Sequence, residues 1–364
     1  MDLEKRLGLI KQVGEEILTE EELKNLLETK AHPIAYDGFE PSGKLHIAQG
    51  IMRAINVNKM LSAGVHFKMW VADWFGWLNN KMGGDLEKIQ IVGKYQIEVW
   101  KACGMKTKEI EFLWTSEVIA KNPEYWKRTL NIARTNSVAR IIRCAQIMGR
   151  SETENLSAAQ IFYPCMQASD IFELKADITQ LGMDQRKVNI LARETGPKLG
   201  LWKPVVVSHH MLMGLKQVSH EDRIEYGKMS AIDRAIGMKM SKSIPDSAIF
   251  MDDSAEEIKR KISKAFCPEK IIEENPILEY CRYLIFEKFK TLKIERQQKF
   301  GGNLELENFD ELAKIYSEGK LHPMDLKNSV ALHIDKMVAP AREHFASGKA
   351  KKLLEQVRGF EVTR

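Results

Sequence analysis

Short apolar runs alternate with stretches of helical periodicity through the first half of the chain. The runs at 33–39, 65–73 and 110–114 predict buried strands. The segments that start at 47 and at 86 carry apolar residues at the spacing of a helix. Further strands are predicted at 176–179 and 205–208. Strands that alternate with helices favour a parallel sheet with right-handed crossovers.

The alternation breaks near both ends of the chain and once in the middle. Residues 118–160 are long, helical and basic, and they predict an insertion between the two halves of a doubly wound sheet. The N-terminal residues predict two helices, the second opened by a capping box of Thr19 and Glu22. After a second box, Ser254 with Glu257, the pattern is almost wholly helical.

These breaks predict an α/β protein with a Rossmann-like, doubly wound parallel sheet as its catalytic domain and an all-α C-terminal domain. The predicted parts are N-terminal helices at 1–30, the catalytic domain at 31–217 with its helical insertion at 118–160, a linker at 218–251 and a helical domain at 252–364.

Composition narrows the class of protein without naming it. A chain of 364 residues with 44% hydrophobic and 29% charged residues is typical of globular proteins with more than one domain. The net charge of +5 permits an RNA partner but does not require one. Five scattered cysteines without a CxxC pair argue against a zinc site and favour reduced thiols. With no targeting segment and no membrane-spanning run, we expect a cytoplasmic protein.

The stretch from 33 to 50 combines a strand, a tight turn and a helix start. Pro41, Ser42 and Gly43 form the turn, and His46 stands where the helix opens. A cation-capable imidazole beside unpaired helix N–H groups suits phosphate oxygens. The stretch lacks both the GxGxxG and the GxxxxGK[ST] patterns, so neither a dinucleotide site nor a P-loop is indicated.

Two motifs resemble the signatures of class I aminoacyl-tRNA synthetases. The first is Pro41-Ser42-Gly43-Lys44-Leu45-His46-Ile47-Ala48-Gln49, which is similar to the "HIGH" signature. It departs from that pattern at Ala48 and Gln49, which replace the glycine and the second histidine. The second is Lys239-Met240-Ser241-Lys242-Ser243, identical to the KMSKS signature. The resemblance implies ATP-dependent amino-acid activation with His46, Lys239 and Lys242 as the catalytic residues.

The implied chemistry explains why these residue types are needed. A carboxylate attacks the α-phosphate of ATP and expels pyrophosphate, and this nucleophile is already ionised. The work is therefore positioning and neutralisation of charge on the phosphates, which needs cations and hydrogen-bond donors rather than a triad. Lysines on a loop can close on the pyrophosphate late in the reaction. Taken without the first motif, Lys239 and Lys242 would read as a solvated charge run.

The segment at 161–170 places Tyr163, Gln167 and Asp170 on one helix face. It resembles the tyrosine-binding helix of archaeal and eukaryotic tyrosyl-tRNA synthetases. The resemblance implies that Asp170 and Tyr36 bind the hydroxyl of tyrosine, and that Tyr163, Gln167 and Gln185 bind its amino group. Buried polar groups left unpaired by phenylalanine would make such a site selective. The alternative is an ordinary helix start with a partly exposed Asp170.

The same resemblance implies the remaining contacts. For ATP, bound with Mg²⁺, it implies Gly38, Gly43, His46, Asp184, Met240 and Lys242, with Asp184 on the ribose. For tRNA(Tyr), it implies Arg143, Arg186 and Lys187 near the acceptor end, and His322 and Asp325 at the first anticodon base. A solvated basic helix face and a plain helix start are the other interpretations of these residues. Asp73, at the end of a predicted strand, is either a supporting site residue or a helix cap.

We therefore expect a homodimer, joined through the insertion, that binds L-tyrosine, ATP and tRNA(Tyr), with no membrane and no metal held by the protein alone. One alternative is a tryptophanyl-tRNA synthetase, which shares both signatures. Others are a non-catalytic synthetase relative that only binds RNA, and a small HxGH nucleotidyltransferase. The last would leave the helical domain unexplained.

Overall fold

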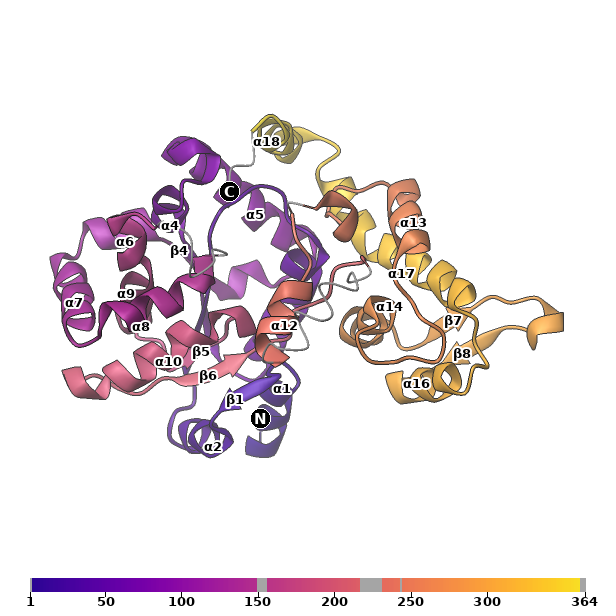
Figure 1. Cartoon of the computed structure of the whole chain (residues 1–364), viewed down its shortest axis with the longest axis horizontal. Coiled ribbons are helices and arrows are strands. Elements are labelled where there is room, and N and C mark those ends of the chain that lie inside the picture. The colour runs from indigo at the N-terminus through magenta and orange to yellow at the C-terminus, as the bar shows by residue number, and fades with distance from the viewer. Residues whose placement is uncertain (1, 149–155, 217–230, 243, 361–364) are drawn as a thin grey trace.

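The computed structural model describes residues 2–148, 156–216, 231–242 and 244–360, and its centre is a six-stranded sheet (Figure 1). The strand order is β1-β6-β5-β2-β3-β4. The strands are β1 Glu16–Leu18, β2 Ile34–Phe39, β3 His66–Val71, β4 Ile110–Trp114, β5 Ile178–Thr179 and β6 Val205–Ser208. All pairs are parallel except β1 with β6.

The strand order creates a topological switch point between β2 and β5. From β2 the chain moves outward through β3 to β4, and then returns to place β5 on the other side of β2. In open α/β sheets, ligands bind beyond the carboxyl ends of the strands at such a point. The doubly wound sheet is confirmed, and its switch point predicts where the site lies.

Helices cover both faces of the sheet, and the insertion supplies one of these covers. The helices before β6 are α1 Leu3–Lys11, α2 Glu20–Thr29, α3 Arg53–Ser62, α4 Asp73–Leu78, α5 Leu86–Ala102, α6 Thr115–Ala120, α7 Pro123–Arg134, α8 Val138–Cys144, α9 Ala158–Glu173 and α10 Arg186–Thr195. The Thr19–Glu22 capping box is present at α2, and a second, of Ser157 and Gln160, opens α9.

The second half of the chain is helical, as predicted, with additions. Its helices are α12 Ala231–Met238, α13 Ala255–Lys264, α14 Pro276–Tyr280, α15 Phe286–Lys288, α16 Phe309–Ser317, α17 Pro323–His344 and α18 Gly348–Arg358. A two-stranded antiparallel ribbon, β7 Leu292–Ile294 with β8 Leu304–Leu306, interrupts the helices. In Figure 1 this region lies beside the sheet, and α18 lies back over α5. No helix in the described ranges combines the length and apolarity of a membrane span.

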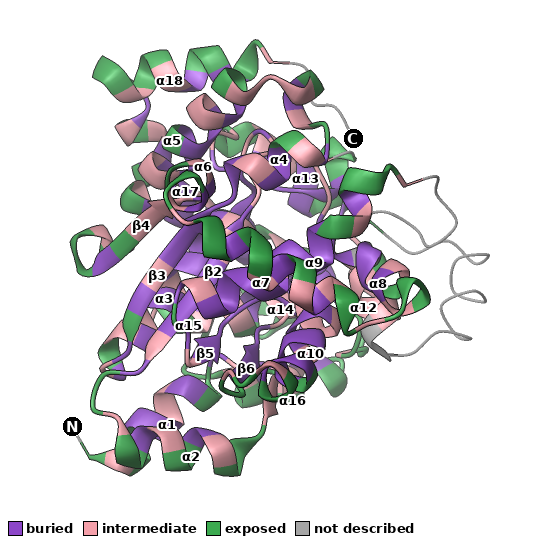
Figure 2. Ribbon diagram, turned by 90° about the vertical axis from the view of Figure 1, so that its left-hand side faces the viewer, coloured by how far each residue is buried: buried purple, intermediate pink, exposed green. Residues whose placement is uncertain are grey.

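Apolar side chains form two cores, one on each face of the sheet. One core holds residues of α1, α3 and α5 and continues into the helical region as far as α18. The other holds residues of α7, α8, α9 and α10, among them Tyr125 and Ile171. Figure 2 shows buried residues concentrated in the strands and exposed ones on outer helices such as α18. The strands that carry the site are therefore held from both sides.

The structure corrects several predicted boundaries. β1 was not predicted, because three residues form a strand here only by pairing with the edge of β6. The strand predicted at 65–73 ends at Val71, since Asp73 begins α4. α12 lies inside the predicted linker, whose residues 218–230 fall outside the described ranges. The helix after His46 begins with the π-helical turn Ala48–Met52 before α3.

Candidate active site

A cavity of about 380 Å³ lies at the switch point, beyond the carboxyl ends of β2 and β5. The turn after β2, one face of α9, the segment after β6 and the Lys239–Lys242 segment all contribute to its lining. Predicted residues that line it are Tyr36, Gly38, His46, Tyr163, Gln167, Asp170, Asp184, Gln185, Lys239, Met240 and Lys242. The structure thus brings together residues that are more than two hundred positions apart in the sequence.

The alternation of side chains along β2 divides the cavity into two halves. Tyr36 and Glu40, the residue that follows β2, face α9, whereas Asp37 and Phe39 face α3. Successive residues of a strand point to opposite faces of the sheet, so one strand supplies both halves. We call the half beside α9 the phenol half and the half beside α3 the nucleotide half.

The phenol half ends in two buried oxygen-bearing groups. Tyr36 and Asp170 are each 1% exposed, and the Tyr36 hydroxyl has no hydrogen-bond partner among the described residues. Burial, followed by the nearby carboxylates Asp170 and Asp37, raises the pKa of Tyr36 well above its usual value, so the phenol stays protonated. Burial also raises the pKa of Asp170, although the hydroxyl of Tyr125 opposes this shift. A ligand that buries a hydroxyl here would satisfy both groups.

The other end of the phenol half carries hydrogen-bonding groups in contact with one another. The Tyr163 hydroxyl donates to Oε2 of Glu40 at 3.0 Å. The Gln167 amide donates to Oε1 of Gln185 at 3.0 Å, and Gln185 donates to the carbonyl of Ile147 at 3.3 Å. One carboxylate, one phenol and two amides can accept hydrogen bonds from an ammonium group.

Sequence reasoning missed two residues here: Glu40, which lines the phenol half, and Tyr125, which contacts Asp170 without lining the cavity. Tyr125 of α7 is fully buried, and its hydroxyl lies 2.7 Å from Oδ1 of Asp170 and 3.0 Å from the carbonyl of Met166. Nothing in the local sequence marks Tyr125, because its contact is made between two helices. Glu40 could have been found, since it directly follows the central strand at the switch point.

The nucleotide half is built around His46, which is 7% exposed. Its Nδ1 has no partner among the described residues, and its backbone forms a bridge with Phe250. Burial, and then the charges of Lys242 and Lys239, lower the pKa of His46 well below its usual value. A pKa held this low keeps the imidazole neutral near pH 7, so His46 acts as a hydrogen-bonding group and not as a cation.

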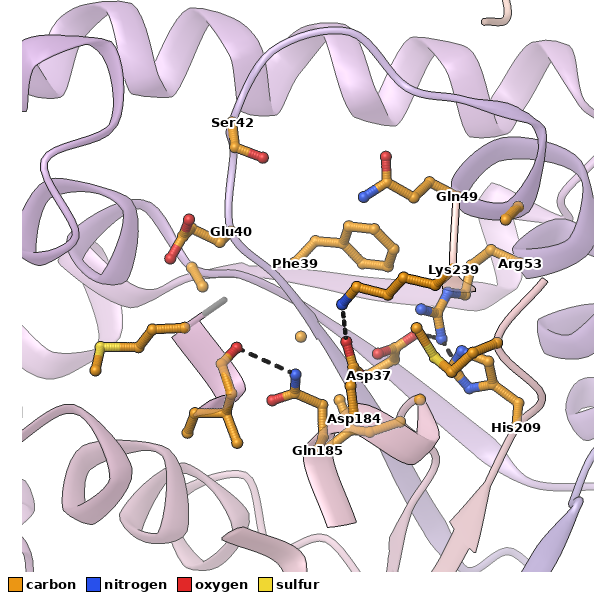
Figure 3. Close-up of a pocket in the computed structure, with 18 of the residues that line it drawn as sticks. Asp37, Phe39, Glu40, Ser42, Gln49, Arg53, Asp184, Gln185, His209 and Lys239 are labelled. Atoms are coloured by element: carbon orange, nitrogen blue, oxygen red, sulfur yellow. Dashed lines mark hydrogen bonds and ion pairs between the residues drawn. The ribbon is translucent and has the colours of Figure 1, made fainter. Parts of the chain in front are cut away.

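The two signature lysines contact protein groups on either side of the nucleotide half. The Lys239 ammonium lies 2.8 Å from Oδ2 of Asp184, and that of Lys242 lies 3.1 Å from Oγ of Ser42 (Figure 3 labels Lys239, Asp184 and Ser42). Burial tends to raise the pKa of Asp184, but the charge and hydrogen bond of Lys239, together with a hydrogen bond from Gln185 and the charge of Arg53, hold this pKa below the usual value. Burial lowers the pKa of Lys242 to about 7. A polyphosphate would give both lysines a new anionic partner.

A buried ion pair that the sequence did not reveal lines the nucleotide half. Arg53 pairs with Asp37, lies over the ring of Phe39, and its Nη1 is 3.2 Å from Nδ1 of His209 (Figure 3). Gln180 contacts the same Nδ1 at 2.9 Å. Since both neighbours are donors, Nδ1 of His209 must accept. Burial and the Arg53 charge lower the pKa of His209 well below its usual value, which keeps the ring neutral.

Other predicted residues lie outside this cavity. Gly43 is not among its lining residues; it adopts a φ of +104°, which favours glycine in the turn. Asp73 is fully buried and accepts hydrogen bonds from Trp74 and Ser116, which makes it a structural residue that joins α4 to α6. Arg150, on the predicted basic insertion, and Ser243 fall outside the described residues.

The residues predicted to bind tRNA occupy two regions. Arg143 of α8 and Lys187 of α10 both lie close enough to Cys144 to lower the pKa of its thiol, although burial raises it overall. Arg186 is 2.7 Å from Glu16 of β1. His322 caps α17 by accepting from the N–H of Met324 at 3.1 Å, and Asp325 lies in the first turn of that helix.

The fold and the site define the class of protein. The family described as class I tRNA synthetases (W and Y) matches residues 28–339, which is most of the chain and includes both halves of the cavity. Within that class, the chain belongs to the tyrosine–tRNA ligases. The cytoplasmic tyrosine–tRNA ligase 1 of Arabidopsis thaliana is 52% identical over 366 residues, covering all of this chain and 90% of that protein. The tyrosine–tRNA ligase of Thermococcus kodakarensis is 40% identical, with both chains fully covered.

Solved structures agree with this assignment. The Leishmania major tyrosyl-tRNA synthetase in complex with tyrosinol has a TM-score of 0.88 and 43% identity over 98% of this chain, which spans 52% of that longer chain. The Pyrococcus horikoshii enzyme complexed with L-tyrosine has a TM-score of 0.88, 37% identity and full coverage of that chain. The Plasmodium falciparum tryptophanyl-tRNA synthetase, at 18% identity and a TM-score of 0.67, shares the fold. The predicted tyrosyl-tRNA synthetase family is confirmed.

Proposed function

We propose that this chain activates L-tyrosine with ATP to form tyrosyl-adenylate and pyrophosphate, and then transfers tyrosine to the 3′ end of tRNA(Tyr). The observation that carries the proposal is the pairing, in one cavity, of a buried hydroxyl-binding end made by Tyr36 and Asp170 with a nucleotide half that contains His46 and both signature lysines. Membership of the tyrosine–tRNA ligases supports it.

In the phenol half, the hydroxyl of tyrosine would share hydrogen bonds with Tyr36 and Asp170. Its ammonium group would lie among Glu40, Tyr163 and the amides of Gln167 and Gln185, whose mutual contacts it would replace. This orientation sends the carboxylate toward the nucleotide half. An indole has no hydroxyl to satisfy both buried groups, which favours tyrosine over tryptophan.

In the nucleotide half, the charges of ATP would rearrange the lysine contacts. Asp184 would exchange its bond to Lys239 for the ribose hydroxyls, which frees Lys239 for the phosphates. Lys242 and the neutral His46 would then donate to oxygens on which charge develops as pyrophosphate leaves. Gly38 lines the cavity, and its lack of a side chain would leave room for the reacting groups. Gly43 would shape the turn, and Met240 would line the nucleotide half.

Mg²⁺ would arrive with ATP as the substrate complex. Among the described residues, no group of three or more His, Cys, Asp or Glu side chains could hold a metal ion. The ion would therefore be coordinated mainly by phosphate oxygens and water, as magnesium often is in nucleotide sites. It would neutralise phosphate charge alongside the lysines.

Two regions of the surface suit tRNA. Arg143, Arg186 and Lys187 would bind phosphates near the acceptor end. In the helical region, the exposed ring of Phe300 lies in the tip of the β7–β8 ribbon, with the Lys299 ammonium 4.9 Å from its centre. At the start of α17, the carboxylate of Asp325, beside His322, would accept from the edge of an unpaired base, and the Phe300 ring would offer a face for stacking.

The insertion would join two copies of the chain. Large apolar side chains are exposed there, including Trp126 at 41%, Leu130 at 55% and Val138 at 63%, and Phe162, just after the insertion, is 40% exposed. Such a concentration of apolar surface is typical of an interaction site. We also infer a cytoplasmic location, since all five cysteines are free thiols and the Arabidopsis thaliana relatives are named cytoplasmic.

Pyrophosphate exchange with each of the twenty amino acids, followed by charging of tRNA(Tyr), tests the proposal. We expect exchange stimulated by tyrosine alone. Stimulation by tryptophan instead would support the tryptophanyl alternative. RNA binding without exchange for any amino acid would support a non-catalytic relative.

A further inference from the structure

His210 binds two carboxylates that come from distant parts of the chain. Its Nδ1 lies 3.2 Å from Glu15, and its Nε2 lies 3.1 Å from Oε2 of Glu279. Its ring is stacked on Tyr283 of the helical region, with centroids 4.1 Å apart and an interplanar angle of 11°. Since both nitrogens face acceptors, both must donate, and the ring is an imidazolium. Burial opposes this charge, yet the two carboxylates raise the pKa of His210 to about 9.

The same oxygen of Glu279 also binds the backbone of Met213. Oε2 accepts from the N–H of Met213 at 2.9 Å, and the hydroxyl of Tyr280 donates to the carbonyl of Met213 at 3.0 Å. Two consecutive residues of α14 therefore hold both polar backbone groups of one residue in the segment after β6. Tyr280 is fully buried, so its bond is protected from water.

Met213 in turn pairs with the segment that carries the signature lysines. It forms an antiparallel bridge with Lys239. The flanking bonds run from the N–H of Met240 to the carbonyl of Leu212 at 3.0 Å and from the N–H of Gly214 to the carbonyl of Met238 at 2.9 Å. An isolated two-stranded contact of this kind is marginal by itself. The hydrogen bonds from α14 supply the support that a neighbouring strand would give in a sheet.

We infer that Glu279 and His210 are positioning residues that hold the Leu212–Gly214 segment in the register from which Lys239 reaches the nucleotide half. This inference rests on the proposed function, in which Lys239 binds the phosphates of ATP. His210 and Leu212 line the same cavity as Lys239, so a shift of this segment would move one wall of the site as well as the lysine. We expect neither Glu279 nor His210 to contact substrate. Each affects the position of Lys239 through Met213.

Glu279→Ala and Glu279→Gln separate the two functions of the carboxylate. Alanine removes the acceptor for Met213 and the partner of His210, so we expect the kcat of tyrosine-dependent exchange to fall by about ten- to a hundredfold. Glutamine keeps an oxygen that can accept from Met213, so its loss is expected to be smaller. The KM for tyrosine is expected to stay unchanged, since tyrosine lies in the other half of the cavity. Glu287→Ala is the matched control, because Glu287 pairs with Lys59 at 2.6 Å between the helical region and α3.

A double-mutant cycle with Lys239→Ala distinguishes positioning from general stabilisation. If Glu279 acts through Lys239, the double variant is no slower than Lys239→Ala alone. The inference would be overturned if the double variant lost kcat by the product of the two single losses. It would also be overturned if Glu279→Ala had the same kcat as Glu287→Ala. If thermal unfolding shows that Glu279→Ala is not folded, the same double-mutant cycle with Lys239→Ala is measured with His210→Gln and with Glu279→Gln.

The pH profile provides a second readout. The charge of His210 is present below pH 9 and is lost as the pH rises through about 9, so the kcat ratio of wild type to His210→Gln is expected to fall toward one there. The charged and titratable groups that face this ring are Glu15, Glu279, Arg282, Tyr283 and His209. A ratio that does not change with pH would contradict the role of His210. A wild-type protein without tyrosine-dependent exchange would instead refute the proposed function.

Discussion

In the proposed function, the selectivity of the phenol half depends on one buried carboxyl group. Asp170 is 1% exposed, and its Oδ1 accepts from the Tyr125 hydroxyl at 2.7 Å. Asp170→Asn keeps the volume but replaces one oxygen with an amide donor. We expect the ratio of kcat/KM for tyrosine to that for phenylalanine to fall by about tenfold or more, because tyrosine loses an acceptor that phenylalanine never used. Exchange assays with both amino acids measure the ratio, and an unchanged ratio would mean that the pocket lies elsewhere.

The charge state of Lys242 gives a prediction about pH. Burial lowers the pKa of Lys242 to about 7, opposed by the Glu40 carboxylate, so at pH 8 the amine of the free protein is mostly neutral. A bound polyphosphate favours the charged form and raises the pKa again. We therefore expect ATP binding to take up nearly one proton at pH 8 and almost none at pH 6. Calorimetry in buffers of different ionisation enthalpy measures this uptake. Lys242→Arg stays charged throughout, and an equal uptake in that variant would contradict the assignment.

At the scale of elements, the turn between β5 and α10 holds the carboxylate of Asp184, which we propose binds the ribose, through a tight contact. A Cβ on Gly182 would lie 2.6 Å from Oδ1 of Asp184 and 2.8 Å from the sulfur of Met211. Gly182→Ala must therefore displace Asp184, and we expect the KM for ATP to rise by about tenfold while tyrosine binding is unaffected. Gly8→Ala in α1 is the control, since a Cβ there meets nothing within 4 Å and should stabilise the helix. Equal ATP affinities in both variants would argue against the role of Asp184.

The elements that sequence analysis predicted correctly are those with a local cause. β2, β4 and α5 follow from apolar runs and periodicity, and the predicted bounds of β4 and the predicted start of α5 agree with the structure. β1 depends instead on the edge of β6, to which nothing near Glu16 points. The same distinction applies to the site. His46 and Lys242 lie in continuous motifs, whereas the Arg53–Asp37 pair and the Tyr125–Asp170 contact form only when separate elements pack together.

At the scale of the whole molecule, the helical region and the cavity are expected to make separable contributions. Asp325 lies in the first turn of α17, beside the His322 cap. Asp325→Ala should raise the KM for tRNA(Tyr) by about tenfold, because it removes an acceptor for an unpaired base, and should leave pyrophosphate exchange unchanged. Charging assays measure the KM for tRNA(Tyr), and exchange assays on the same preparation measure adenylate formation. A loss in both assays would indicate misfolding and not a defect in recognition.

Assembly of two copies is the last property that the surface predicts. Leu130 of α7 is 55% exposed beside Trp126, within the insertion, and Leu332 of α17 is 59% exposed in the helical region. If the insertion joins two copies through a two-fold interface, the substituted residue of each copy lies in that interface, so one mutation changes it at two places. Leu130→Glu is then expected to weaken the dimer by about a hundredfold or more, since two buried leucines are replaced by charges. Leu332→Glu alters an equally exposed leucine outside the insertion and should leave the dimer intact. Sedimentation equilibrium of both variants measures the difference, and a dimer weakened only by Leu332→Glu would move the interface to the helical region.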